Sequence, residues 1–290
     1  MFQAKPLTIE LIEIINGKNA RIKPQIVNLL IDLASKNKVL LDLLRILDIH
    51  SSLRDIQEEA LKKEVEATRT ISEVLRRLDF AFFKLLKPVA YIPSDIDVLI
   101  KLEDASKAIK RMKRVGYKAI VKEPYCIEFN DGSLGIDLYT YPTLGSVAYI
   151  DGQALLEFTA TAEFGGMKIR TLESCAEAVI TAAHAVYKEG IYTLNDFFVI
   201  KKWVSKRSFK LAEELNCEPA LRLATNLNRM IEKGSLEVPY RLPPPMLFTL
   251  MLRKLYNDDL ARATLSNILR ALRDPRLGKL VLWRLTRPTY

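Results

Sequence analysis

The stretch that decides the fold is PSDIDVLI, residues 93–100. Its polar and apolar residues alternate with the period of a β-strand, so Asp95 and Asp97 share one face while the residues between and after them face a core. Two neighbouring carboxylates repel each other unless a cation lies between them, and a hard divalent ion with oxygen ligands is the natural one. The stretch therefore predicts a strand that presents two ligands to Mg²⁺.

A second acidic strand follows in LGIDLYTY, residues 134–141, where Asp137 and Tyr139 share one face. If the two strands are neighbours, Asp137 completes a three-carboxylate site. Such a site holds two metals about 3.5–4 Å apart, which align an attacking oxygen and activate a triphosphate. The alternative is an acidic pair that is merely solvated at an exposed strand end.

The residues around these two strands predict a mixed sheet. Short runs rich in β-branched and aromatic residues indicate further strands, and the apolar spacing in residues 103–116 indicates a helix between them. The turn formers at residues 130–132 favour an antiparallel hairpin of the last two strands. The runs are AFFKLLK (81–87), YKAIVKE (117–123) and YCIEFN (125–130).

Helical periodicity flanks the sheet on both sides. We predict an α+β fold with three parts: an N-terminal helical arm (1–79), an α/β core (80–170) and a C-terminal basic helical domain (171–290). Thr171 is the expected N-cap of the first C-terminal helix. The three prolines at 243–245 are expected to form an extended break.

The composition is that of a folded protein, with 49% hydrophobic and 27% charged residues among 290. No apolar run is long enough to span a membrane and the N-terminus lacks signal-peptide features, so we expect a cytoplasmic protein. Residues 201–290 hold 18 Lys and Arg against 8 Asp and Glu, whereas residues 1–200 hold 26 against 27. The net charge of the chain, +9, therefore comes from its last third. This basic excess predicts either a polyanionic partner that binds the last third or a basic surface that is merely solvated.

FFKLLKPVAYIPSDIDVLI (82–100) followed by GIDLYTYP (135–142) resembles the nucleotidyltransferase superfamily, whose signature is an Asp-hydrophobic-Asp pair with a third acidic residue on a neighbouring strand. The following region is similar to the helices of poorly characterised bacterial and archaeal nucleotidyltransferases, in which a His-bearing helix precedes a Leu-x-Asp segment. The resemblance implies that Asp95, Asp97 and Asp137 are the catalytic and metal-binding residues. It also implies that His184 is a possible lining residue of the cleft, although a lone His there is more often structural.

The sequence departs from that family at the phosphate-binding turn. The family carries a Gly-Ser or Gly-Gly pair before the acidic strand, but no glycine occurs between residues 80 and 100. Nucleotide binding is then expected to fall to Lys84, Lys87 and Ser94.

The candidate nucleic-acid contacts are basic residues of the C-terminal third. Basic side chains that contact phosphates give affinity for nucleic acid that does not depend on its base sequence. The alternative interpretation is that these residues form a basic surface that is only solvated. The candidates are Lys201, Lys202, Lys206, Arg207, Arg262, Arg270 and Arg273.

The resemblance implies an enzyme that uses Mg²⁺ or Mn²⁺ to transfer a nucleotidyl group from a nucleoside triphosphate such as ATP. The basic C-terminal third favours RNA, including transfer RNA, over a small molecule as the acceptor. The alternative is an inactive nucleotidyltransferase-like scaffold that binds nucleic acid or protein. The sequence leaves the nucleotide, the acceptor and the oligomeric state open.

Overall fold

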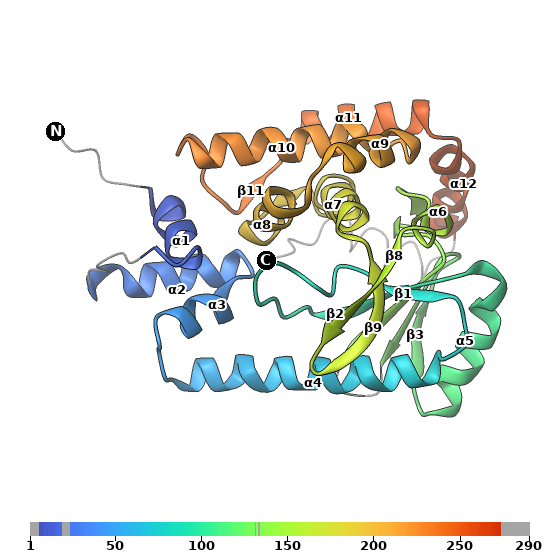
Figure 1. Ribbon diagram of the computed structural model, residues 1–290. Coiled ribbons are helices and arrows are strands. Elements are labelled where there is room, and N and C mark those ends of the chain that lie inside the picture. Colours follow the sequence, from blue (N-terminus) through green and yellow to red (C-terminus); the bar gives the residue numbers. More distant parts are fainter. Residues whose placement is uncertain (1–5, 19–23, 131, 133, 274–290) are drawn as a thin grey trace.

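A computed structural model describes residues 6–18, 24–130, 132 and 134–273, the side chains of residues 268–273 excepted. The fold is α+β, as the sequence predicts, with a mixed sheet between helical layers (Figure 1). The helices are α1 (Leu7–Ile15), α2 (Val27–Lys36), α3 (Leu40–Ile46), α4 (Ser52–Val74), α5 (Leu102–Arg114), α6 (Gly152–Leu155), α7 (Ser174–Ala183), α8 (Leu194–Trp203), α9 (Lys206–Glu214), α10 (Glu218–Glu232), α11 (Pro244–Asn257) and α12 (Asp259–Arg273), with a 3₁₀ turn η1 (Pro24–Ile26) and a π-helical turn η2 (His184–Glu189).

Seven strands form the main sheet in the order β3-β4-β5-β2-β1-β9-β8. They are β1 (Phe80–Phe82), β2 (Asp95–Ile100), β3 (Lys118–Lys122), β4 (Cys126–Asn130), β5 (Gly135–Tyr139), β8 (Thr159–Phe164) and β9 (Met167–Leu172). Two small antiparallel pairs complete the set, β6 (Thr143–Leu144) with β7 (Val147–Ala148) and β10 (Ile191–Tyr192) with β11 (Tyr240–Arg241).

The alternation of residues along β2 places two different cores on the two faces of the sheet. Ile96, Val98 and Ile100 join one core with the apolar stripes of α4 and α5. Leu99 belongs to the other core, with Tyr139 of β5 and the C-terminal helices. In Figure 1, α4 runs along one side of the sheet, and α7, α8 and α10 lie on the other. The carboxylates of β2 therefore face the C-terminal helices.

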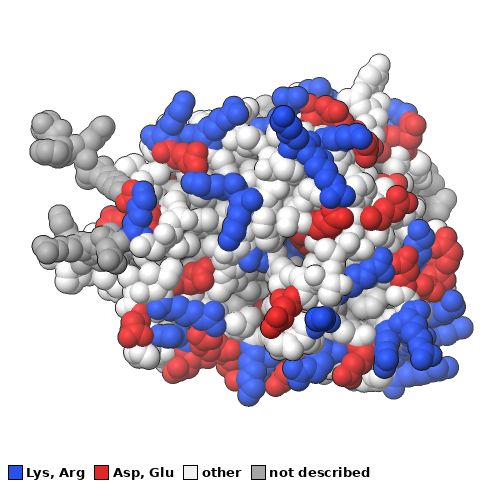
Figure 2. Space-filling model, viewed as in Figure 1, with Lys and Arg blue, Asp and Glu red and all other residues white. Residues whose placement is uncertain are grey.

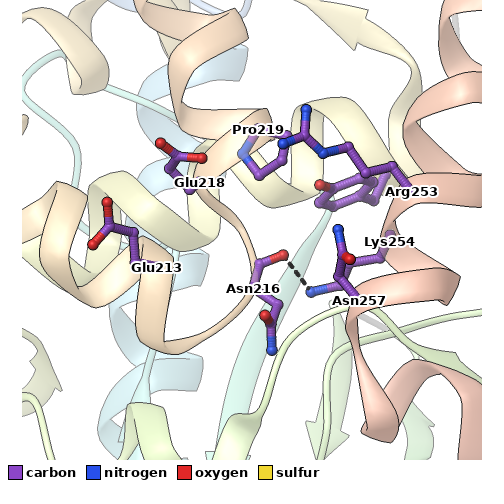
Figure 3. A pocket seen from close by; sticks show the side chains of 8 residues that line it. Glu213, Asn216, Glu218, Pro219, Arg253, Lys254 and Asn257 are labelled. Carbon is purple, nitrogen blue, oxygen red and sulfur yellow. Dashed lines mark hydrogen bonds between the residues drawn. The ribbon is translucent and has the colours of Figure 1, made fainter.

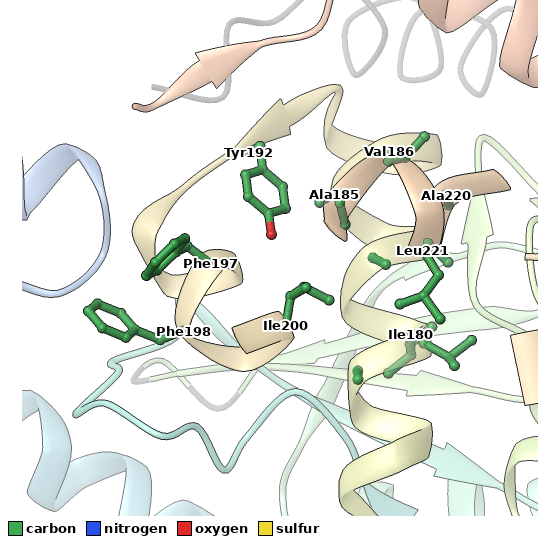
Figure 4. Close-up of a cluster of buried hydrophobic side chains, with 14 of the residues drawn as sticks. Ile180, Ala185, Val186, Tyr192, Phe197, Phe198, Ile200, Ala220 and Leu221 are labelled. Atoms are coloured by element: carbon green, nitrogen blue, oxygen red, sulfur yellow. The ribbon is translucent and has the colours of Figure 1, made fainter. Parts of the chain in front are cut away.

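The C-terminal helices pack around α7, every residue of which after Ser174 is buried. Figure 4 shows Ile180 of α7 near Leu221 of α10, with Phe197 and Ile200 of α8 alongside. The chain then enters the π-helical turn η2, which ends at Gly190 in the left-handed conformation (φ 63°). Because π turns shift the face that later residues present, η2 turns His184, Lys188 and Glu189 away from the regular helix pattern.

Two sequence-based predictions are corrected. Thr171 is not an N-cap: it lies in β9 of the β8–β9 hairpin, where its hydroxyl donates to the Phe82 carbonyl, and Glu173 is the N-cap of α7. The prolines do not form an extended break, since Pro244 and Pro245 open α11, where the first turn of a helix needs no amide donors. Lys38 separates α2 from α3 with a left-handed backbone (φ 58°).

Within the described residues, no helix has the length and apolar character needed to cross a bilayer. The cysteines Cys126, Cys175 and Cys217 are all buried, and none of them forms a disulfide bond. The three-part division of the chain and a cytoplasmic location stay predictions.

Candidate active site

The two acidic strands are direct neighbours. β2 and β5 pair in parallel, and the register sets Asp95 opposite Gly135 and Asp97 opposite Asp137. Because side chains alternate along a strand, all three carboxylates project from the same face at the ends where both strands begin. The adjacency on which the three-carboxylate prediction depends is thus confirmed.

A lysine reaches this cluster from the loop after β1. Lys84 has a left-handed backbone (φ 57°), and its Nζ lies 2.8 Å from Asp97 Oδ2. Its backbone amide donates to both carboxylate oxygens of Glu177 in α7, at 2.9 and 3.1 Å. The loop after β1 is therefore fixed from both sides, and the side chain of Lys84 points toward the acidic strands.

The buried carboxylates still carry surplus negative charge. Burial raises the pKa of Asp97 to about 6; Lys84 opposes this rise and the charge of Asp95 adds to it. Burial, and then the charge of Asp95, also raise the pKa of Asp137. A single ammonium group does not neutralise three carboxylates, so the cluster favours further positive charge.

Lys188 of η2 is a second cation at the site, and sequence reasoning missed it. Tyr139 donates its hydroxyl to Asp137 Oδ2 at 2.7 Å, and Lys188 Nζ donates to the same hydroxyl at 3.3 Å while lying 5.7 Å from the ring centre. Lys188 also lowers the pKa of Asp137 by its charge, against the larger effect of burial. Nothing in the pattern around residue 188 marks it, since its role comes from the π-helical turn.

The donor chemistry of the cluster fits a divalent cation, because carboxylate oxygens are the ligands of Mg²⁺ and Mn²⁺. As the side chains stand, however, no three His, Cys, Asp or Glu residues within the described chain are grouped closely enough to hold one. Asp97 is directed at Lys84, and Asp137 accepts from Tyr139. Binding a metal here requires these carboxylates to exchange partners.

A small polar cavity of about 50 Å³ lies beside the carboxylates. The predicted residues Lys84, Lys87 and His184 all line it, together with Lys38 from the N-terminal arm, which was not predicted. Lys87 Nζ donates to Thr181 Oγ1 at 3.1 Å. Burial, and then the surrounding lysines, lower the pKa of His184 well below its usual value, so its ring is neutral at pH 7.

The candidate Ser94 does not line the cavity; its hydroxyl lies 3.4 Å from Asp95 Oδ1. Asp196 does line it, and its carboxylate accepts from the amide and the hydroxyl of Thr193, the N-cap of α8.

The candidate nucleic-acid contacts divide into two groups. Lys201, Arg207 and Arg262 each form an ion pair within the chain, with Glu232, Glu173 and Asp259 respectively. Lys202 and Lys206 are exposed. The side chains of Arg270 and Arg273 lie outside what the structure describes.

A larger cavity of about 350 Å³ opens between the α9–α10 turn and α11 (Figure 3). Its wall contains Lys254, whose side chain is 1% exposed and lies 2.6 Å from Asp258 Oδ2. The same ammonium donates to the carbonyls of Leu215 and Asn216, at 3.2 and 3.0 Å. Lys254 thus ties α11 to the turn before α10, and the carboxylate cluster takes no part in this cavity.

We expect Lys254→Met to reduce the free energy of unfolding by about 3 kcal/mol, because the change leaves Asp258 and two carbonyls buried without their cation. Chemical denaturation measures the loss. The matched control is Arg253→Met, since Arg253 is exposed and its removal should change stability by less than about 0.5 kcal/mol. Equal effects of the two substitutions would contradict the structural role of Lys254.

The chain matches no protein-family model and no curated protein sequence. It is similar to two solved structures of the nucleotidyltransferase class. One is a lincosamide antibiotic adenylyltransferase bound to lincomycin, which is 19% identical to this chain. The match covers 48% of this chain and 93% of that chain, with a TM-score of 0.34. The other is the antibiotic-resistance factor ANT(2'')-Ia, which is 15% identical to this chain. The match covers 60% of this chain and 96% of that chain, with a TM-score of 0.32. At these TM-scores neither likeness defines the fold or the activity of this chain.

Proposed function

We propose that this chain transfers a nucleotidyl group from a nucleoside triphosphate to an acceptor hydroxyl, with Asp95, Asp97 and Asp137 holding Mg²⁺ or Mn²⁺. The observation that carries the proposal is the parallel register of β2 and β5, which sets Asp97 opposite Asp137 with Asp95 on the same face. A divalent cation held there would neutralise the charge of the triphosphate and of the pyrophosphate that leaves, and would orient the acceptor oxygen toward the α-phosphorus that it attacks. The raised pKa of Asp97, despite its ion pair with Lys84, supports a site that favours a further cation.

The chain's own residues divide the remaining work. Lys84 and Lys87 bind donor phosphates from the loop after β1, and Ser94 binds at the entry to β2. Asp137 accepts the proton of the acceptor hydroxyl after it has exchanged the Tyr139 hydroxyl for the metal and the acceptor. Phosphoryl-type transfer depends mainly on the positioning of the reactants and on the neutralisation of charge. The residues named here are of the types that these two tasks need.

For the acceptor we propose RNA. Besides Lys202 and Lys206, five exposed basic residues gather on α5 and the edge strand β3, and none of the five lies within ion-pair distance of a described carboxylate. Figure 2 shows Lys and Arg side chains concentrated over the α5 region. Since Lys118 pairs with Asn130 and Gly135 with Asp95, this basic edge begins at the same end of the sheet as the carboxylates. The five residues are Lys110, Lys113, Arg114, Lys118 and Lys122.

A non-catalytic scaffold is the second candidate, and the Lys84–Asp97 ion pair favours it. In that case Lys84 is a permanent replacement for a metal, and the basic surfaces bind nucleic acid or protein. The two candidates differ in one respect, which is whether a metal ion displaces Lys84.

The test is metal-dependent nucleotide binding followed by transfer. We expect calorimetry to detect binding of a non-hydrolysable nucleoside triphosphate only when Mg²⁺ or Mn²⁺ is present, and labelled nucleotide to appear on RNA. Asp95→Ala should abolish both signals, whereas Glu103→Gln, a change at an exposed residue of α5, should alter neither. Nucleotide binding that is absent, or the same with and without metal, would exclude the enzyme and leave the scaffold.

A further inference from the structure

The loop that connects β1 to β2 is held by hydrogen bonds from its backbone to two helices. The Lys84 amide donates to the carboxylate of Glu177 in α7, and the Ala90 amide donates to Asp42 Oδ2 in α3 at 2.7 Å. Glu177 is buried and Asp42 is partly buried, so both bonds are shielded from water. The backbone on either side of Tyr91 is therefore positioned without any contribution from the Tyr91 hydroxyl.

The Tyr91 side chain lines the small polar cavity beside the carboxylates, and its hydroxyl has no hydrogen-bond partner among the described residues. Tyrosine hydroxyls that are withdrawn from water usually find a partner. Tyr139 and Tyr192 do so, since they donate to Asp137 and to Asn228 Oδ1, each at 2.7 Å. The hydroxyl of Tyr91 is therefore a donor that the fold itself does not use.

The charges around this hydroxyl place it on the carboxylate side of the cavity. Burial, and then the charges of Asp95 and Asp97, raise the pKa of Tyr91 well above its usual value. Asp196, which also lines the cavity, has a smaller effect than either of them. The hydroxyl therefore stays protonated at neutral pH, and it lies under the influence of the proposed metal ligands.

The cavity itself does not select an anion. The carboxylates of Glu189 and Asp196 line it together with the ammonium groups of Lys84 and Lys87, so its walls carry charges of both signs. Its volume of about 50 Å³ holds a few water molecules, whereas sites for drug-sized ligands measure roughly 300–1,000 Å³. A nucleotide that reaches Tyr91 therefore lies outside the cavity, over the carboxylates of β2 and β5.

A triphosphate at that place needs donors from the loop between β1 and β2. No glycine occurs between residues 80 and 100, so this loop offers side-chain donors in place of the backbone amides of a glycine-rich turn. A hydroxyl that donates to an ionised phosphate oxygen forms one of the stronger kinds of hydrogen bond. Tyr91 lies on the same loop as Lys84 and Lys87 and lines the same cavity.

We propose that the Tyr91 hydroxyl donates a hydrogen bond to a phosphate oxygen of the nucleotide donor. Tyr91 then joins Lys84 and Lys87 in binding the triphosphate from the loop between β1 and β2. This inference rests on the proposed function, because it names a further binding residue for the donor of that reaction.

The test is calorimetric titration of the full chain, in the presence of Mg²⁺, with a non-hydrolysable nucleoside triphosphate and with inorganic tripolyphosphate. Tyr91→Phe removes only the hydroxyl. We expect it to bind both probes at least about 10-fold more weakly than the wild type, because a hydrogen bond to a charged group contributes that much. Its melting temperature should not fall, since the lost hydroxyl has no partner in the fold.

Tyr192→Phe is the matched control, because it removes a buried hydroxyl that donates to Asn228. This control should melt at a lower temperature and keep its affinity for both probes. Equal affinity of the wild type and Tyr91→Phe would overturn the inference, and so would a wild-type chain that does not bind tripolyphosphate. A loss confined to the nucleoside triphosphate would also overturn it, because the hydroxyl would then contact the nucleoside.

The outcome is separate from that of the transfer assay. Weaker binding of tripolyphosphate by Tyr91→Phe, in a chain without transfer activity, would remove the proposed function and keep the phosphate contact. Transfer activity with the same KM for the nucleotide in the wild type and in Tyr91→Phe would keep the function and remove the contact.

Discussion

Asp95→Asn is expected to abolish nucleotide transfer while making the folded chain more stable. The loss should be at least about 100-fold, because the substitution removes one of three carboxylates that hold the metal. Stability should rise by about 1 kcal/mol at neutral pH, since the charge of Asp95 raises the pKa of both Asp97 and Asp137. Opposite changes in activity and stability are typical of a residue retained for function.

The two effects are measured by labelled-nucleotide transfer and by urea denaturation. Asp95 suits this test better than Asp97, because Asp97→Asn would leave the buried ammonium of Lys84 without its partner and would mix folding with function. A decrease in stability together with unchanged transfer would show that Asp95 is a structural residue.

Glu64→Gln is expected to remove a large pH dependence of folding. Glu64 lies in α4 and is 1% exposed, and neither carboxylate oxygen has a hydrogen-bond partner among the described residues. Burial raises its pKa to about 8 from 4.5. Between these two values the folded chain keeps a proton that the unfolded chain has released, so stability falls as the pH rises from about 4.5 to about 8 and is level above.

The size of this fall is on the order of 5 kcal/mol, because each pH unit between the two pKa values contributes about 1.4 kcal/mol. Chemical denaturation at a series of pH values measures it. Glu64→Gln should flatten the profile and be the more stable protein at pH 8, whereas Glu66→Gln, an exposed residue of the same helix, should follow the wild type. A wild-type profile that is already flat would mean that Glu64 is ionised in the folded state and has a partner.

The sequence by itself determined the chemistry of the acidic strands. The period of two in DIDVLI and GIDLY fixes which side chains share a face, and turn formers fix the β4–β5 hairpin. Once strands of this kind pair in register, Asp97 and Asp137 must project side by side. The α+β class follows for the same reason, because periodicity is a local property that the sequence carries directly.

Only the tertiary structure decided which cations meet those carboxylates. Lys84 pairs with Asp97, Lys188 binds Tyr139, and Lys38 reaches the cavity because Asn37 bonds to a segment 157 residues away. None of these residues differs in its local pattern from an exposed lysine. Their roles arise from burial and from the proximity of distant segments, which local periodicity does not encode.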